Sequence, residues 1–197
     1  MKKISLSNAK DIYFRELEYL KDGISNSKNP YHFLYLSTLN NDYPQSRTVV
    51  LRGFKNKPNK ILFNADFRSP KVKQLIENSN CLALFYDNDR KVQLRFNCRA
   101  IINHKNSLSY KVWSKTPLQS RKCYMGDLEP SKVINNWDPN IPIEYLKKDP
   151  EQKNSELGYE NFTVIELIVN NLDLLELHHD GHIRFNIHND KITFLAP

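Results

Sequence analysis

The chain has 197 residues and a formal net charge of +7, a length that predicts one domain (residues 1–197) with its own buried core. No apolar run reaches the roughly 20 residues that a membrane helix needs, and no apolar stretch typical of a signal peptide follows the charged N-terminus. The cysteines are odd in number, widely spaced and without a CxxC pair, which argues against a disulfide framework or a zinc site: Cys81, Cys98 and Cys123. We therefore expect a soluble cytoplasmic protein with mostly buried, reduced thiols and no membrane partner.

The positive charge has two explanations. A nucleic-acid-binding protein places Lys and Arg against phosphates, whereas a Lys-rich surface with a few arginines suits a small anionic ligand. The lysines are scattered, mostly over expected loops. This favours the small ligand and predicts no nucleic-acid partner.

The first half of the chain reads as one helix followed by strands. Residues 1–25 form an N-terminal helical segment, with the helix over residues 8–20, Asn8 or Ser7 as its cap, and Ile12, Leu17 and Leu20 among its apolar contacts. A loop at residues 23–30 follows. Short β-type runs then alternate with turn clusters at residues 40–45, 55–59 and 87–90, and these runs cover residues 33–39, 47–54, 60–64, 81–86 and 92–102. Adjacent strands with one inserted helix suggest an antiparallel barrel, mainly β with peripheral helices.

The second half begins with a helix at residues 106–115, in which Leu108, Val112 and Trp113 are candidates for burial. Residues 116–159 are rich in proline and charge and predict an irregular insertion with one short helix near residues 132–137. Strands are expected at residues 162–169, 172–177, 182–187 and 191–195, the last two forming a hairpin around Asn189 and Asp190.

A helix start after the strand at residues 60–64 carries the first functional signal. Ser69 can cap this helix and Pro70 suits its first position, while Val72, Leu75 and Ile76 form an apolar stripe. Unpaired N–H groups and the helix dipole favour an anion at such an end. Basic side chains flank it or can reach it, namely Arg68, Lys71 and Arg47. We expect a phosphate pocket here.

Two strands carry polar residues on one face. In residues 47–52, alternation sets Arg47, Val49 and Leu51 on one side and Thr48, Val50 and Arg52 on the other. In residues 92–99, one face carries Gln93, Arg95, Asn97 and Arg99. Exposed arginines on an edge strand and a solvated face are the alternative explanations. The functional interpretation is that Gln93 and Arg95 line a cleft and donate hydrogen bonds to the carbonyl oxygens of a heteroaromatic ring.

Three histidines near residue 180 invite a metal-site interpretation: His178, His179 and His182. They lie around an expected turn rather than on a helix, and no cysteine or carboxylate set completes them. A structural or solvent-exposed role is favoured, and no metal site is expected.

The ordered motifs RTVVLRGF, ILFNADFRSPKVKQLIEN, CLALFYDNDRKVQLRFNCRA and the final HIRF…LAP together resemble those of pyridoxamine 5′-phosphate oxidases and their FMN-binding relatives. The resemblance covers about residues 30–197 and is weakest over 116–159. It implies an FMN-binding split β-barrel, antiparallel and Greek-key-like, assembled as a homodimer with flavin at the interface.

The resemblance also assigns residues. It implies that the strand at residues 47–52 lies along the flavin, that Phe63 and Asn64 contact FMN, and that the phosphate loop contains Arg68, Ser69 and Lys71. Gln93 matches the glutamine that reaches the ring, and Arg184 matches a late basic residue. With Arg95, the implied cofactor-binding set is Arg47, Thr48, Val49, Val50, Leu51, Arg52, Phe63, Asn64, Arg68, Ser69, Lys71, Gln93, Arg95 and Arg184.

The substrate side departs from the family pattern. The C-terminal tryptophan is replaced by Leu175 or a neighbour, no Arg-x-His motif is present, and the substrate-side residues are only loosely echoed by Tyr110, Lys115 and Ser120. We therefore expect an FMN-dependent oxidoreductase that transfers hydride between a small substrate and flavin N5, with no catalytic residue assigned. Alternatives are a genuine pyridoxamine or pyridoxine 5′-phosphate oxidase and a non-enzymatic flavin or haem carrier.

Overall fold

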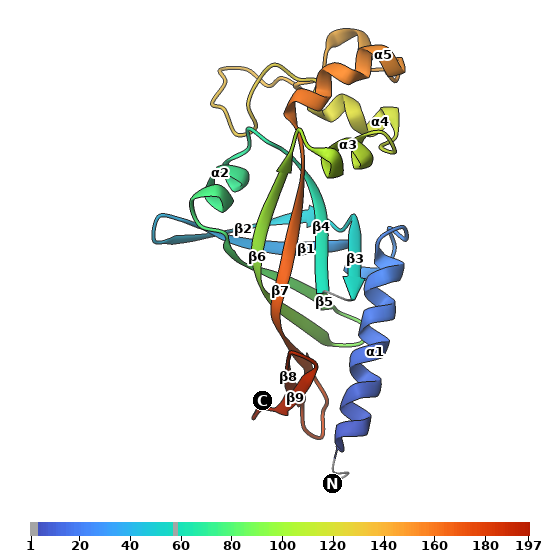
Figure 1. The fold of residues 1–197 in the computed structure, drawn as a ribbon, viewed down its shortest axis with the longest axis vertical. Helices are drawn as coiled ribbons and strands as arrows, with labels where there is room; N and C mark the ends of the chain where they lie inside the picture. The colour runs from blue at the N-terminus through green and yellow to red at the C-terminus, as the bar shows by residue number, and fades with distance from the viewer. Residues whose placement is uncertain (1–3, 57–58) are drawn as a thin grey trace. The chain divides into compact units, whose positions relative to one another are not determined.

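The computed structural model describes residues 4–56 and 59–197. The turn expected at residues 55–59 includes residues 57 and 58, which lie outside the described residues. The described part of the chain contains nine strands, β1 Phe33–Asn40, β2 Tyr43–Val50, β3 Gly53–Asn56, β4 Asn59–Asp66, β5 Asn80–Asp87, β6 Val92–His104, β7 Phe162–Glu176, β8 Ile183–His188 and β9 Lys191–Phe194. Its α-helices are α1 Leu6–Gly23, α2 Pro70–Glu77, α3 Ser107–Trp113, α4 Leu118–Arg121 and α5 Gln152–Ser155 (Figure 1).

The strands join in the order β2-β1-β5-β6-β7-β4-β3, and β8 pairs with both β7 and β9. The pairs β1–β2, β1–β5, β3–β4, β5–β6, β7–β8 and β8–β9 are all antiparallel. The expected fold class, mainly β and antiparallel with peripheral helices, is confirmed. None of the helices in the described part of the chain is long and apolar enough to cross a membrane.

The chain divides into two compact units. The first contains Met1–Phe63, Asn78–Ile101 and Glu166–Pro197, and the second contains Asn64–Glu77 and Ile102–Ile165. The strands β4, β6 and β7 run from one unit into the other.

The first unit holds α1 beside the sheet. α1 contacts β3 and β9 and runs alongside them in Figure 1. Its cap is Ser5, whose hydroxyl accepts a hydrogen bond from the N–H of Asn8 in a capping box, so the expected start at Ser7 or Asn8 is wrong. Leu17 and Leu20 are buried as expected.

Glu16 attaches α1 to the sheet, although its charge gave no sequence signal for burial. Its carboxylate is fully buried and accepts hydrogen bonds from the hydroxyl of Tyr31 and from Nη1 of Arg90. Arg90 also pairs with Asp87 and lies 3.6 Å from the ring centroid of Tyr19. Tyr31, Arg90 and also Arg15, whose Nε donates to Oε1 of Glu16 at 2.7 Å, thus compensate the buried charge.

The strand expected at residues 47–54 is two strands. β2 begins earlier, at Tyr43, because the turn at residues 40–45 occupies only residues 41 and 42. The strand is interrupted at Leu51 and Arg52. There the N–H of Leu51 bonds to His32 O, and the N–H of Arg52 bonds to Leu62 O. The break is therefore the point at which the chain leaves β1 and joins β4.

The strands expected at residues 162–169 and 172–177 are one continuous strand, β7. Residues 170 and 171 lay between the two expected strands, but the amide of Asn97 donates to Oδ1 of Asn171 at 2.9 Å, and this cross-strand bond gives the polar residue a partner within the sheet. The hairpin around Asn189 and Asp190 is confirmed, and both residues have positive φ, at 47° and 61°.

The second unit is built around Trp113, which is fully buried as expected. The guanidinium of Arg121 lies 4.7 Å from the ring centroid of Trp113, and Glu156 accepts hydrogen bonds from both side chains. The short helix expected at residues 132–137 is absent from this described segment. Val133 and Trp137 are 92% and 86% exposed, so burial does not stabilise a helix there.

Candidate functional site

The loop before α2 places Arg68 in an ion pair with Asp66. Nε and Nη2 of Arg68 donate to the two oxygens of the Asp66 carboxylate at 3.1 and 2.8 Å. Nη2 and Nη1 also donate to the carbonyl oxygens of Gly126 and Asp127. The hydrogen bonds that Arg68 donates to Asp66 raise the pKa of Arg68 above its ordinary value, against the opposing effect of partial burial. Asp66 thus fixes the guanidinium and offsets part of its charge. The sequence did not predict this partner of Arg68.

Ser69 and Lys71 complete this loop. The Ser69 hydroxyl is buried and donates to Asp66 O at 2.7 Å, while Nζ of Lys71 donates to the same hydroxyl at 3.1 Å. The carbonyl of Ser69 accepts from the N–H of Val72 and so starts α2. Val72 and Leu75 are buried as expected, but Ile76 is 58% exposed and lies off the apolar stripe.

The chemistry of this loop fits a phosphate group. Two cations and a hydroxyl gather at the start of an eight-residue helix. Oδ1 of Asn64, in the same unit, is enclosed and has no hydrogen-bond partner among the described residues, so it is an acceptor that a ligand N–H would satisfy. A cavity of about 370 Å³ in this unit is lined by Gly126 and Asp127, whose carbonyl oxygens bind Arg68.

The β2 residues belong to the first unit. Nη1 of Arg47 donates to Oγ1 of Thr38 at 2.6 Å and to the carbonyl oxygens of Leu36 and Gln45, and partial burial lowers the pKa of Arg47. The expected alternation holds, since the Arg47 side includes two buried residues and the opposite side is more open: Val49 and Leu51 against Thr48, Val50 and Arg52. Leu51 and Phe63 have no exposed surface.

Arg95 and Arg184 meet at one carboxylate, that of Asp173. Nη2 of Arg95 donates to Oδ2 of Asp173, and Arg184 donates through Nε and Nη2 to both oxygens at 3.2 and 2.8 Å. Burial alone would raise the pKa of Asp173, but hydrogen bonds from the two arginines outweigh it and lower the pKa below its ordinary value. Two cations and one anion leave a net positive cluster, and its two arginines are 40% and 27% exposed.

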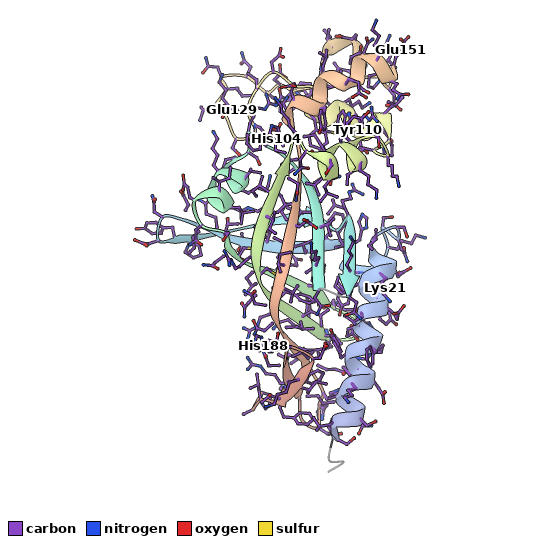
Figure 2. All side chains as sticks on the ribbon, viewed as in Figure 1. Lys21, His104, Tyr110, Glu129, Glu151 and His188 are labelled. Atoms are coloured by element: carbon purple, nitrogen blue, oxygen red, sulfur yellow. The ribbon has the colours of Figure 1, made fainter. Side chains whose placement is uncertain are left out.

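The remaining residues that were expected to bind the ring or the substrate lie on several different elements. Gln93 faces Tyr86 across the β5–β6 pair and is half-buried. In the second unit, Tyr110 on α3 is 60% exposed with its ring 5.9 Å from that of Tyr159 (Figure 2). Lys115 follows α3 and Ser120 lies in α4.

The histidine run near residue 180 forms a turn. Nδ1 of His182 accepts from the N–H of His178, and His179 is fully exposed. Among the described residues, no group of three or more His, Cys, Asp or Glu side chains is placed to hold a metal ion.

The sequence could have pointed to Asp173. It is the one charged residue in the otherwise apolar run Leu172–Leu175 of β7, a position where a charge needs a partner. Asp66 gave no such signal, because an acidic residue at a strand end is ordinary.

The chain is similar to known proteins both in sequence and in fold. Residues 16–104 match the family model "Pyridoxamine 5′-phosphate oxidase, FMN-binding domain". The chain is 32% identical over 101 residues to pyridoxine/pyridoxamine 5′-phosphate oxidase 2 of Arabidopsis thaliana. This match covers 47% of the chain and 51% of the plant protein, so it spans about half the length of that relative.

Solved structures share the fold. One is a pyridoxamine 5′-phosphate oxidase-related, FMN-binding protein from Nostoc punctiforme, with a TM-score of 0.71, 21% identity, and coverage of 93% of this chain and 96% of that one. Another is PhzG from Burkholderia lata 383, in complex with tetrahydrophenazine-1-carboxylic acid, with a TM-score of 0.69, 15% identity, and coverage of 96% and 92%. Residues 16–104 are therefore similar to the FMN-binding domain of pyridoxamine 5′-phosphate oxidases, and the chain shares its fold with FMN-binding proteins related to them.

Proposed function

We propose that the protein is an FMN-dependent oxidoreductase that transfers hydride between a small substrate and the flavin. The match of residues 16–104 to the FMN-binding domain model carries this proposal. Bound FMN supplies the hydride-accepting N5 position and the electron storage. The side chains of the protein then have to bind the phosphate, orient the ring and exclude water.

Two groups of residues are assigned to these tasks. Lys71 binds the phosphate directly, the Ser69 hydroxyl positions its ammonium group, and Arg68 adds charge while Asp66 holds the guanidinium in place. In the first unit, the net positive Arg95–Asp173–Arg184 cluster would stabilise a negative charge placed beside it. No side chain is required to move a proton in this scheme.

The absorption spectrum of the purified protein tests cofactor binding. We expect a yellow protein with flavin bands that bleach anaerobically when a small-molecule reductant is added and return with an electron acceptor. A protein that binds flavin but is not turned over by any reductant would be a carrier and would contradict the enzymatic part. A colourless protein that does not take up added FMN would contradict the whole proposal.

Lys71 provides the residue-level test, with a matched control on the same helix. We expect Lys71→Ala to weaken FMN binding about 10- to 100-fold, because a hydrogen bond to a charged group contributes about 1.5–3 kcal/mol. Lys73→Ala removes the same charge from α2, but Lys73 pairs with Glu129 on the surface and its loss should leave FMN affinity within about twofold. Titration of apo-protein with FMN, followed by flavin fluorescence, measures both. Equal effects of the two changes would refute the phosphate-loop assignment.

A second candidate activity is oxidation of pyridoxamine or pyridoxine 5′-phosphate, supported by the identity to the plant oxidase. Incubation with pyridoxamine 5′-phosphate under oxygen would then yield pyridoxal 5′-phosphate and peroxide. Turnover of this substrate would select the second candidate, and its absence in a flavin-loaded protein would reject it.

We also propose that the protein is a homodimer. Apolar side chains stand exposed on one face of β1, where Phe33 and Tyr35 are 45% and 49% exposed. Leu84, opposite Tyr35 on β5, is half-buried and lies on the same face. A second copy of the chain would cover this face.

A further inference from the structure

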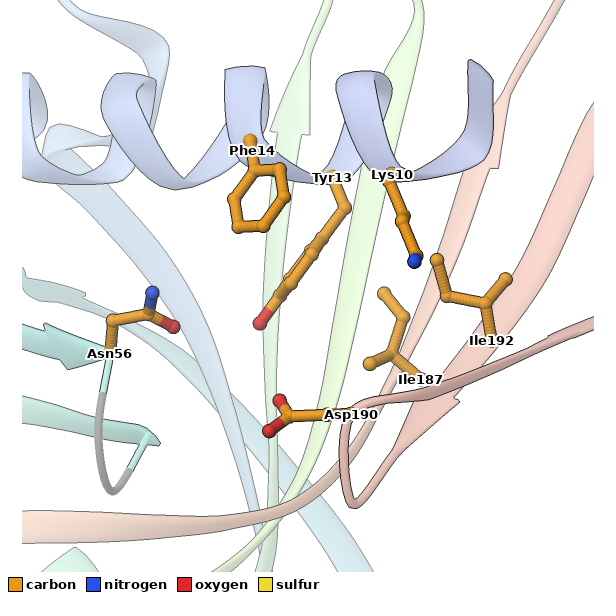
Figure 3. Close-up of a pocket in the computed structure, with 7 residues that line it drawn as sticks. All are labelled: Lys10, Tyr13, Phe14, Asn56, Ile187, Asp190 and Ile192. Carbon is orange, nitrogen blue, oxygen red and sulfur yellow. The ribbon is translucent and has the colours of Figure 1, made fainter. Parts of the chain in front are cut away.

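A cavity of about 310 Å³ lies in the first unit, between α1 and the β8–β9 hairpin (Figure 3). One wall carries the rings of Tyr13 and Phe14 from α1, and the facing wall carries Ile187 and Ile192 from the hairpin. Phe14 is 54% exposed although it faces this cavity. The two walls thus offer aromatic and aliphatic surfaces in a space within the usual range for a small-molecule site.

A second cavity of about 230 Å³ adjoins the first, because Asn56, Ile187 and Asp190 line both. Its lining is rich in amides and includes Asn59. Nδ2 of Asn59 donates to the Tyr13 hydroxyl at 3.4 Å, but Oδ1 is enclosed and has no donor among the described residues. The second cavity therefore has in its lining a buried acceptor that needs a donor.

Two opposite charges complete the site. Asp190 lies at the tip of the hairpin and Lys10 on α1, so they enter the first cavity from different walls (Figure 3). In the part of the chain that the structure describes, neither forms an ion pair. Asp190 and Asn59 accept hydrogen bonds at one end of the site, whereas Lys10 donates.

We propose that these joined cavities bind a small aromatic zwitterion. Its ring packs between Tyr13 and Ile187, its protonated amine donates to Asp190 and Oδ1 of Asn59, and its anionic group meets Lys10. None of these residues belongs to the set assigned to FMN, so this site is distinct from the proposed flavin site. A bound ligand would join the N-terminal helix to the C-terminal hairpin.

The test uses the full-length protein as purified, with or without bound flavin, and 4-(aminomethyl)benzoate as the probe. We expect saturable binding in equilibrium dialysis and amide chemical-shift changes concentrated on α1 and the β8–β9 turn. The analogue 4-methylbenzoate, which lacks the amine, should bind at least about tenfold more weakly, because a charged hydrogen bond is lost.

Asp190→Asn should weaken binding of the probe about tenfold or more and bring it to the level of the analogue. Asn suits the backbone of this position, where φ is 61°, so the turn is kept. The control, Asp180→Asn, removes the same charge from a fully exposed position in the β7–β8 loop and should leave binding unchanged. The proposal is wrong if the probe does not saturate the protein, if shifts fall elsewhere, or if the two variants behave alike. Each of these results is independent of FMN binding.

Discussion

Asp173 determines what the two arginines beside it can do. Without it, Arg95 and Arg184 would repel each other, and both side chains would sample several rotamers. With it, the pair is held on one face of the sheet with one net positive charge. Its lowered pKa means that the carboxylate is more stable in the folded chain than in the unfolded one.

Asp173→Asn should therefore lower the free energy of unfolding at neutral pH by about 1–2 kcal/mol. The folded-state pKa of Asp173 lies below its unfolded value near about 3.9. The contribution of this side chain is thus complete above that value and is lost as the pH falls through the folded-state pKa. Urea unfolding of both proteins between pH 7 and pH 3 measures the effect. A difference that stays constant over this range would contradict the role given to the carboxylate.

At the scale of single residues, the sequence predicts which face of a strand is buried, but it does not predict which side chain pairs with a given charged residue. The alternation in β6 was predicted correctly, since Leu94, Phe96 and Cys98 are buried and the face with Arg95 is more open. The acidic partner of Arg95 is 78 residues away in the chain. A pairing of that kind depends on the fold of the whole sheet, and one sequence does not contain it in readable form.

The helix α1 is held to the sheet by Glu16 as much as by its apolar stripe. The carboxylate of Glu16 is fully buried. The burial of the Tyr31 hydroxyl and the nearby negative charge of Glu16 both raise the pKa of Tyr31. Glu16→Gln leaves Arg90 with Asp87 as its remaining acidic partner and should lower the free energy of unfolding by about 3 kcal/mol. Denaturant unfolding at neutral pH measures it.

Glu18→Gln is the matched control on the same helix. Glu18 is 70% exposed, and its ion-pair partner among residues 4–56 and 59–197 is Lys21, so the change should cost no more than about 0.5 kcal/mol. If the Glu16 variant were as stable as this control, the buried network would not hold the helix.

Elements with a strong period were predicted well, and the errors have physical causes. The helix α3 lies within the expected range of residues 106–115 and buries Trp113 as expected. The prediction of a helix at residues 132–137 was wrong. A short helix depends on packing for its stability, and the apolar side chains of this segment remain exposed to solvent. The break after β2 was missed because nothing in Leu51 or Arg52 indicates a change of partner strand.

At the scale of the whole molecule, the exposed face of β1 predicts the assembly. Tyr35→Glu would place a charge in the middle of the proposed interface, and burying it would cost several kcal/mol. We expect light scattering to show the molar mass falling from that of two chains to that of one. Leu157→Glu, at a position in the second unit that is 72% exposed, should leave the mass unchanged. A dimeric Tyr35 variant would exclude this face as the interface.

The three cysteines, all within the described part of the chain, differ sharply in access. Cys81 and Cys98 lie opposite each other in the β5–β6 pair, and burial raises the pKa of Cys81 to about 12 and that of Cys98 still further. Cys123 alone is exposed. A maleimide dye or spin label should therefore attach at Cys123 alone, without mutagenesis. The label would then allow spectroscopic distance measurements between two copies of the chain.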